Sequence, residues 1–169
     1  MNKSTEQTLW GLLENITENL KSKRLADVFR LVSFCPFETY GPHKHVRIEI
    51  NYVKKGNCIL HLDDESVTFR EGEIMIITSG SNHLFEAGSE GTTLMQLEFL
   101  PEIFSHFHFK SEDGTVASTP VTLFSEENRV IKIVNNVCIM RVVQRIVNEL
   151  EFKSRYYRYL VVMYYAELL

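Results

Sequence analysis

Six short apolar stretches, separated by turn residues, fill the middle of this chain and constrain its fold more than any other feature. We place strands near residues 45–54, 57–62, 66–70, 73–78, 83–87 and 92–100. Glycine-bearing turns separate several of them, at 55–57, 71–72, 79–81 and 88–91. No long helical pattern interrupts the series, which argues against a parallel α/β sheet. The spacing therefore predicts an antiparallel sandwich or barrel.

Further elements flank this series. Residues 25–36 and 129–134 alternate like strands, and residues 4–22 have the apolar spacing of an amphipathic helix. Two more helices are expected, at 137–153 with Asn135 or Asn136 as its cap, and at 155–169 with Ser154 as its cap. The prediction is a mainly β protein with one helix before the barrel and two after it. Its parts are an N-terminal helical arm at 1–24, a β-barrel at 25–134 and a helical segment at 135–169.

Three histidines and a glutamate stand out around the start of the barrel. His43, His45 and Glu49 are all odd-numbered, so a regular strand places them on one face. His83 follows a second apolar run. Imidazole nitrogens and a carboxylate are ligands for divalent metals. The pattern therefore predicts a candidate metal site made of His43, His45, Glu49 and His83.

A second interpretation of the same residues stays open. The even-numbered positions of this stretch are apolar, so the histidines could also line a metal-free pocket or lie on a solvated sheet face. Arg47 shares the odd face, and a cation beside a metal ion is unfavourable unless an anion compensates it. With Arg47 and Asn51 added to the four candidate ligands, the face would suit a polar small molecule, such as a sugar or a carboxylate.

Composition and charge exclude several classes of protein. The 18 lysines and arginines against 22 acidic residues give a net charge of −4, which argues against DNA binding by this chain alone. The three cysteines are far apart and lack metal-ligand spacing, as expected for a reducing, cytoplasmic setting. Residues 1–20 lack the apolar stretch of a signal peptide, and no apolar run is long enough to span a membrane.

Two motifs resemble those of the cupin superfamily. The segment HKHVRIEINYVKKG at 43–56 matches the first cupin motif, His-x-His-x3-Glu-x6-Gly, at every defining position. The segment GEIMIITSGSNH at 72–83 resembles the second motif, Gly-x5-Pro-x-Gly-x2-His, with Thr78 in place of the proline. This resemblance implies a jelly-roll barrel. It also keeps open a small metal-dependent cupin enzyme, a dioxygenase or an isomerase, as an alternative function.

The amino-acid sequence of residues 49–83 also resembles that of the N-terminal ligand-sensing domain of AraC-type bacterial transcription regulators. The stretches RIVNEL at 145–150 and YYAELL at 164–169 resemble the helical dimerisation segment of that family. The resemblance implies a domain that is not an enzyme. It would bind a small-molecule effector in the barrel and control a C-terminal helix-turn-helix DNA-binding domain, for which this chain has no sequence. DNA would be bound only through that domain.

The last helix is apolar on more than one side. It ends on Leu168-Leu169 within this pattern, so we expect either a longer natural chain or a partner that covers it. A twofold contact between two copies is the simplest cover. The sequence therefore predicts a homodimer whose interface contains Tyr156, Leu160, Met163 and Tyr164.

Overall fold

The computed structural model describes residues 28–104, 109–110, 116–117, 129–134 and 136–168. The helix predicted at 4–22 lies outside the described residues. The strands are β1 (Val28–Phe34), β2 (Thr39–His43), β3 (Ile48–His61), β4 (Ser66–Arg70), β5 (Ile74–Ile77), β6 (His83–Phe99), β7 (Phe109–Lys110), β8 (Val116–Ala117) and β9 (Val130–Ile133). The helices are the short 3-10 turn η1 (Pro101–Phe104), α2 (Val137–Phe152) and α3 (Tyr157–Leu168).

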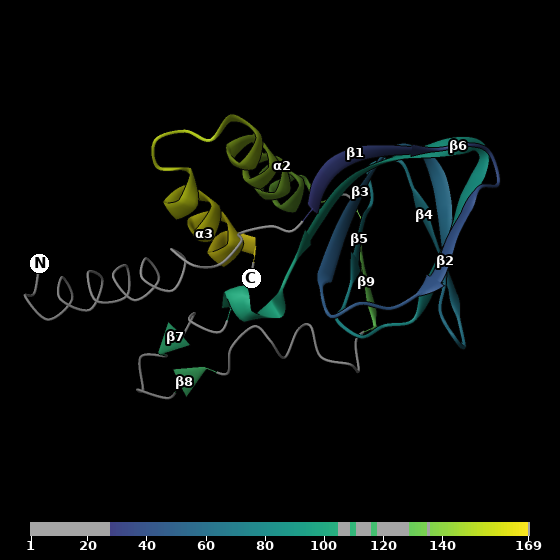
Figure 1. The fold of residues 1–169 in the computed structure, drawn as a ribbon, viewed down its shortest axis with the longest axis horizontal. Coiled ribbons are helices and arrows are strands. Elements are labelled where there is room, and N and C mark those ends of the chain that lie inside the picture. The colour runs from purple at the N-terminus through teal and green to yellow at the C-terminus, as the bar shows by residue number, and fades with distance from the viewer. Residues whose placement is uncertain (1–27, 105–108, 111–115, 118–128, 135, 169) are drawn as a thin grey trace, which may run out of the picture.

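Seven strands form one antiparallel sheet that curls on itself (Figure 1). Its path is β1-β6-β3-β5-β9, and β2 and β4 branch from it by pairing with β6 and β3. In the part of the chain that the structure describes, β1 and β9 end this path and do not pair with each other, so the barrel is not closed. The predicted mainly β jelly-roll fold is confirmed, with helices α2 and α3 on one side of the sheet (Figure 1).

Two predicted turns are wrong. Residues 55–57 and 88–91 lie inside continuous strands, so β3 and β6 each replace two shorter predicted strands. The two long strands pair with each other from Ile48↔Phe99 to His61↔Leu84, and the register shifts on either side of Gly56. The shift between Val53 and Lys55 inserts one residue and is a β-bulge, whereas the shift between Gly56 and Cys58 passes over residues 88–91 of β6. Glycine permits such irregularities as readily as it permits a turn.

The sheet has an apolar core on each face. The outer core joins Ile48, Ile50 and other sheet residues to α2 and α3, where Val143, Ile146 and Tyr165 are fully buried or nearly so. The inner core fills the barrel and has these members: Val53, Cys58, Leu60, Leu62, Phe69, Met75, Ile77, Phe85, Ala87 and Leu94. Strand β5 is buried on both faces, because its residues alternate between the two cores.

Hydrogen bonds at the N-termini of α2 and α3 test the two predicted helix caps. The Asn136 side chain accepts a hydrogen bond from the Ile139 N–H (3.1 Å), which confirms it as the cap of α2. Ser154 was predicted as the cap of α3, which begins only at Tyr157. Its backbone carbonyl accepts from the Tyr157 N–H (3.0 Å), and its hydroxyl donates to Glu149 Oε2 (2.6 Å). Among the described helices, none is long and apolar enough to cross a membrane.

Candidate functional site

The four candidate metal ligands lie together at one end of the barrel. Each offers one ligand atom, and these atoms all lie within 4.8 Å of one another. His43 ends β2 and pairs directly with His83, the first residue of β6. Glu49 lies on β3, whereas His45 lies between β2 and β3. The prediction of a single regular strand through the first three residues is therefore wrong, although the four side chains still converge.

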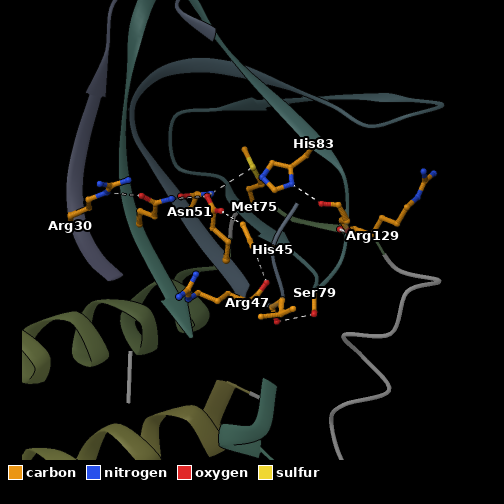
Figure 2. A network of polar contacts seen from close by, with 12 residues as sticks. Arg30, His45, Arg47, Asn51, Met75, Ser79, His83 and Arg129 are labelled. Carbon is orange, nitrogen blue, oxygen red and sulfur yellow. Dashed lines mark hydrogen bonds and ion pairs between the residues drawn. The ribbon is translucent and has the colours of Figure 1, made fainter. Parts of the chain in front are cut away.

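The turn after β5 holds the His45 segment in place. The Gly80 N–H donates to the His45 carbonyl (2.8 Å), and the Ser79 hydroxyl donates to the Val46 carbonyl (2.8 Å; Figure 2). Thr78, which stands where the second cupin motif has proline, is fully buried. Its hydroxyl lies 3.2 Å from the Arg129 carbonyl, to which it donates. The second motif thus positions the first.

Two backbone carbonyls orient two of the imidazole rings. His45 Nδ1 lies 3.0 Å from the Arg47 carbonyl, and His83 Nδ1 lies 2.9 Å from the Ser81 carbonyl. Because a carbonyl only accepts hydrogen bonds, each Nδ1 carries the proton. The Nε2 atom of His83 is then the atom left for a further ligand, whereas His45 Nε2 contacts Glu49 Oε2. A carbonyl on Nδ1 also orients histidines at metal sites.

Glu49 is the centre of the buried polar network. Only 6% of it is exposed, and its carboxylate is contacted by His45 Nε2 (3.0 Å), Asn51 Nδ2 (2.6 Å) and Gln96 Nε2 (2.9 Å). Gln96 in turn accepts a hydrogen bond from Arg30 Nε (2.9 Å). Figure 2 shows this network running from Arg30 on β1 to His45. Burial alone would raise the pKa of Glu49, but the hydrogen bonds outweigh it and lower the pKa to about 2.

The three histidines differ in charge. Burial lowers the pKa of His43 and of His83, so both are neutral at pH 7. The hydrogen bond to Glu49 raises the pKa of His45, which favours its charged form. The contact with Glu49 thus favours a charged imidazole at His45, whereas burial disfavours charge on the other two.

A cavity of about 130 Å³ opens beside these residues inside the barrel. Its polar lining residues are Arg30, Tyr40, His43, Glu49, Asn51, His83 and Gln96. Its apolar lining residues are Val32, Phe34, Leu60, Met75, Ile77, Phe85 and Leu94. The cavity thus has a polar side, which contains three of the four candidate ligands, and a larger apolar side formed by the inner core.

The structure places the other predicted site residues differently. Asn51 lines the cavity, as Glu49 does, but Arg47 does not line it, and the Arg47 side chain extends away from the histidines (Figure 2). Gln96 and Tyr40 line the cavity and were not predicted. Gln96 lies directly opposite Asn51 on the neighbouring strand, and a polar residue on the apolar face of a strand was the signal that could have identified it.

Residues 29–127 match the family model described as the AraC-like ligand binding domain, which is more than half of the chain. The chain belongs to this family. A comparison with curated protein sequences found no match.

The solved structure of ToxT shares the fold of this AraC-like domain, and shorter parts of the chain are similar to other solved structures. Fatty-acid-bound ToxT from Vibrio cholerae strain SCE256 has a TM-score of 0.57 and 11% identity, over 86% of this chain and 56% of that chain. The AraC-like domain therefore spans a little over half the length of ToxT. A predicted oxalate decarboxylase from Thermotoga maritima has a TM-score of 0.43 and 26% identity, over 49% of this chain and 72% of that chain. A cupin superfamily protein from Desulfitobacterium hafniense DCB-2 has a TM-score of 0.39 and 14% identity, over 41% and 63%.

Proposed function

We propose that this AraC-like domain binds a small-molecule effector in the barrel cavity and thereby controls a helix-turn-helix DNA-binding domain joined to it. The observation that carries the proposal is the cavity itself, which has a buried polar side and an apolar side within the barrel. ToxT, which shares this fold, is described with a bound unsaturated fatty acid, in line with a small organic ligand here. The three free cysteines of this AraC-like domain support a cytoplasmic location.

The sheet offers a direct route from the cavity to the helices. On β3, Glu49 and Asn51 face the cavity, whereas Ile48 and Ile50 pack in the outer core with α2 and α3. A ligand that shifts β3 by contact with one face must therefore shift the packing of the helices on the other face. An effector that prefers one arrangement of sheet and helices changes its population, and so changes how an attached domain is presented.

Thermal unfolding with a panel of sugars, carboxylates and small alcohols tests this function. A ligand that binds only the folded state raises Tm, and Tm continues to rise as the ligand concentration exceeds Kd. Leu94→Phe, which fills the cavity from its apolar side, is expected to remove the shift. Met95→Phe is the matched control, because Met95 packs against the outer core instead. A shift that survives Leu94→Phe would place the ligand outside the cavity and contradict the proposal.

The second candidate is a divalent metal ion held by His43, His45, Glu49 and His83, and the residues fit it. His45 Nε2 and Glu49 Oε2 lie 3.0 Å apart, and two atoms bound at right angles at about 2.1 Å to one ion are separated by about this distance. His43 Nδ1 is buried and accepts or donates no hydrogen bond within the described residues. A bound ion would supply Lewis-acid chemistry, which a metal-dependent cupin enzyme would also use.

Elemental analysis of protein purified without chelator is the test of the metal site. We expect divalent metal in the wild type and its loss from a His45→Ala, His83→Ala double variant. Glu49→Gln is the conservative variant, because its amide oxygen still accepts from Asn51 and Gln96 while the negative charge is removed. It should fold and bind metal more weakly. Metal at wild-type occupancy in the double variant would show that these residues are not the site, and turnover of a substrate by the loaded protein would favour the enzyme.

A further inference from the structure

Asn51 lines the cavity and has an unused hydrogen-bond acceptor in its side chain. It is 1% exposed, and it lines the cavity. Its Oδ1 is buried and has no hydrogen-bond partner among the described residues. Buried carbonyl groups are nearly always paired with protein, water or ligand, so a donor from the cavity is expected to complete this residue.

The orientation of the Asn51 amide is fixed by its neighbour. Its Nδ2 donates to Glu49 Oε1 at 2.6 Å. Rotating the amide by half a turn would place the carbonyl oxygen against an ionised carboxylate, where both atoms are acceptors. The free atom is therefore the oxygen, and the group that pairs with it must be an N–H or O–H donor.

The rest of the cavity decides what kind of molecule carries that donor. The opposite wall is apolar, and the rings of Phe34 and Phe85 lie 4.5 Å apart at their centroids. The volume of about 130 Å³ is close to that of an apolar cavity that holds one benzene molecule, about 150 Å³. The space thus suits one ring or a short branched chain, with its apolar body toward Phe34, Phe85 and Leu94.

The apolar wall argues against an ionised ligand. A carboxylate or an ammonium group would lose its hydration against a lining that is mainly apolar. A carboxylate also has no hydrogen to donate to the Asn51 oxygen. An uncharged donor avoids these costs, and a hydroxyl group is the smallest one.

We propose that the effector is a compact, uncharged alcohol or phenol whose hydroxyl group donates to Asn51 Oδ1 and whose apolar body fills the inner side of the cavity. This inference rests on the proposed function, since it names the ligand class of the same cavity. It replaces the sugar or carboxylate expected from the sequence with a less polar molecule.

Calorimetric titration of the whole chain with phenol, toluene and benzoate tests the inference without any variant. Phenol and toluene have nearly the same shape, but only phenol has a donor. We expect phenol to bind about tenfold more tightly than toluene, the difference that one buried hydrogen bond makes. Equal binding of phenol and toluene would overturn the role of Asn51, and tighter binding of benzoate, with or without added divalent metal, would overturn the ligand class.

The variant Asn51→Leu tests whether Asn51 is the residue that accepts the hydrogen bond from the phenol hydroxyl. The variant should lower phenol affinity about tenfold and leave toluene affinity unchanged or higher. Asn148→Leu, the same change at an exposed position of α2, should alter neither. An equal loss for both probes would mean that Asn51 acts only through the fold, which contradicts the inference. If a sugar or carboxylate binds in the cavity instead, the proposed function stands and this inference fails; if no compound of the panel binds there, both fail.

Discussion

Glu73 connects the turn before β5 to strand β9 through a single carboxylate oxygen. Its Oε2 accepts hydrogen bonds from the Arg70 N–H (2.8 Å) and from Lys132 Nζ (2.7 Å). Burial alone would raise the pKa of Glu73, but the hydrogen bonds from Lys132 and from the Arg70 backbone outweigh it and lower the pKa. The ionised form of this residue is therefore bound more tightly in the folded state than in the unfolded state.

Glu73→Gln should destabilise the protein at pH 7 by about 1–2 kcal/mol, because Lys132 loses its charged partner. Since the folded pKa is lowered, the contribution of Glu73 is fully present above its unfolded pKa, about 4.3, and is lost as the pH falls through the folded value. Urea unfolding at pH 7 and at acid pH should show the difference between wild type and variant shrinking on acidification. Glu71→Gln, at an exposed position of the same turn, is the control; an unchanged difference at acid pH would contradict the prediction.

Sequence spacing identified the candidate ligands but not the residues that support them. The histidines and Glu49 follow a motif whose spacing is readable along the chain. Gln96 reaches Glu49 across 47 residues of sequence, and Arg30 reaches Gln96 across 66, so only the strand register brings them together. Arg47 was placed on the ligand face by assuming a regular strand, and the bend between β2 and β3 turns it elsewhere.

Strands β3 and β6 depend on a bulge that a sequence pattern does not distinguish from a turn. Before the bulge, odd-numbered residues such as Val53 face the inner core, and after it even-numbered residues such as Cys58 and Leu60 do so. One inserted residue reverses the face of every residue that follows. The bulge thus puts Cys58 and Leu60 on the same inner face as Val53.

Gly56→Ala should destabilise the domain by about 2–4 kcal/mol. Gly56 has a φ of 79°, and an added Cβ would lie 2.2 Å from the Gly91 carbonyl oxygen on β6. Gly72 is the matched control, since it has a φ of 86° but no atom within 4 Å of an added Cβ. Gly72→Ala should therefore cost only the backbone strain, about 1–2 kcal/mol. Equal losses for the two variants in urea unfolding would show that the close approach of β3 and β6 does not matter.

Element boundaries were predicted well where the residues that define them are close together in the sequence. Strands β4, β5 and β9 and helices α2 and α3 were predicted to within about two residues, because periodicity and flanking turns define them locally. Strand β2 was not predicted, since its sequence, TYGPH, contains glycine and proline and is mostly exposed. Strand β2 forms because it pairs with β6, and the residues of β6 are distant from β2 in the sequence.

Helix α3 carries apolar side chains on two sides of the molecule. Val161, Val162 and Tyr165 are buried against the sheet and α2. On the other side, Tyr156 and Met163 are each 57% exposed and Tyr159 is 45% exposed. Tyr156 lies in the turn just before α3, and its spacing of three and then four residues to Tyr159 and Met163 makes one stripe on the outer surface. This pattern is typical of helices that pack against a second helix.

We predict that this stripe forms a twofold dimer contact, together with Leu160 and Tyr164. Each large side chain that such a contact buries would contribute about 1.5–3 kcal/mol. Met163→Glu should convert the dimer to monomers, because the charge would be buried without a partner. Sedimentation at micromolar concentrations would measure the change, with Gln144→Glu, an added charge on the exposed side of α2, as the control.

The dimer contact must also be distinguished from a contact with an attached DNA-binding domain, which could cover the same stripe. The residues themselves separate the two cases, since a twofold contact pairs the stripe with its own copy and needs no other part of the protein. A dimer of residues 1–169 that Met163→Glu dissociates would support self-association through α3. A wild-type chain that is monomeric under these conditions, or a Met163→Glu variant that stays dimeric, would contradict it. Helix α3 packs on the sheet face opposite the cavity. In a dimer formed through α3, the helices that lie behind the two effector cavities would therefore contact each other.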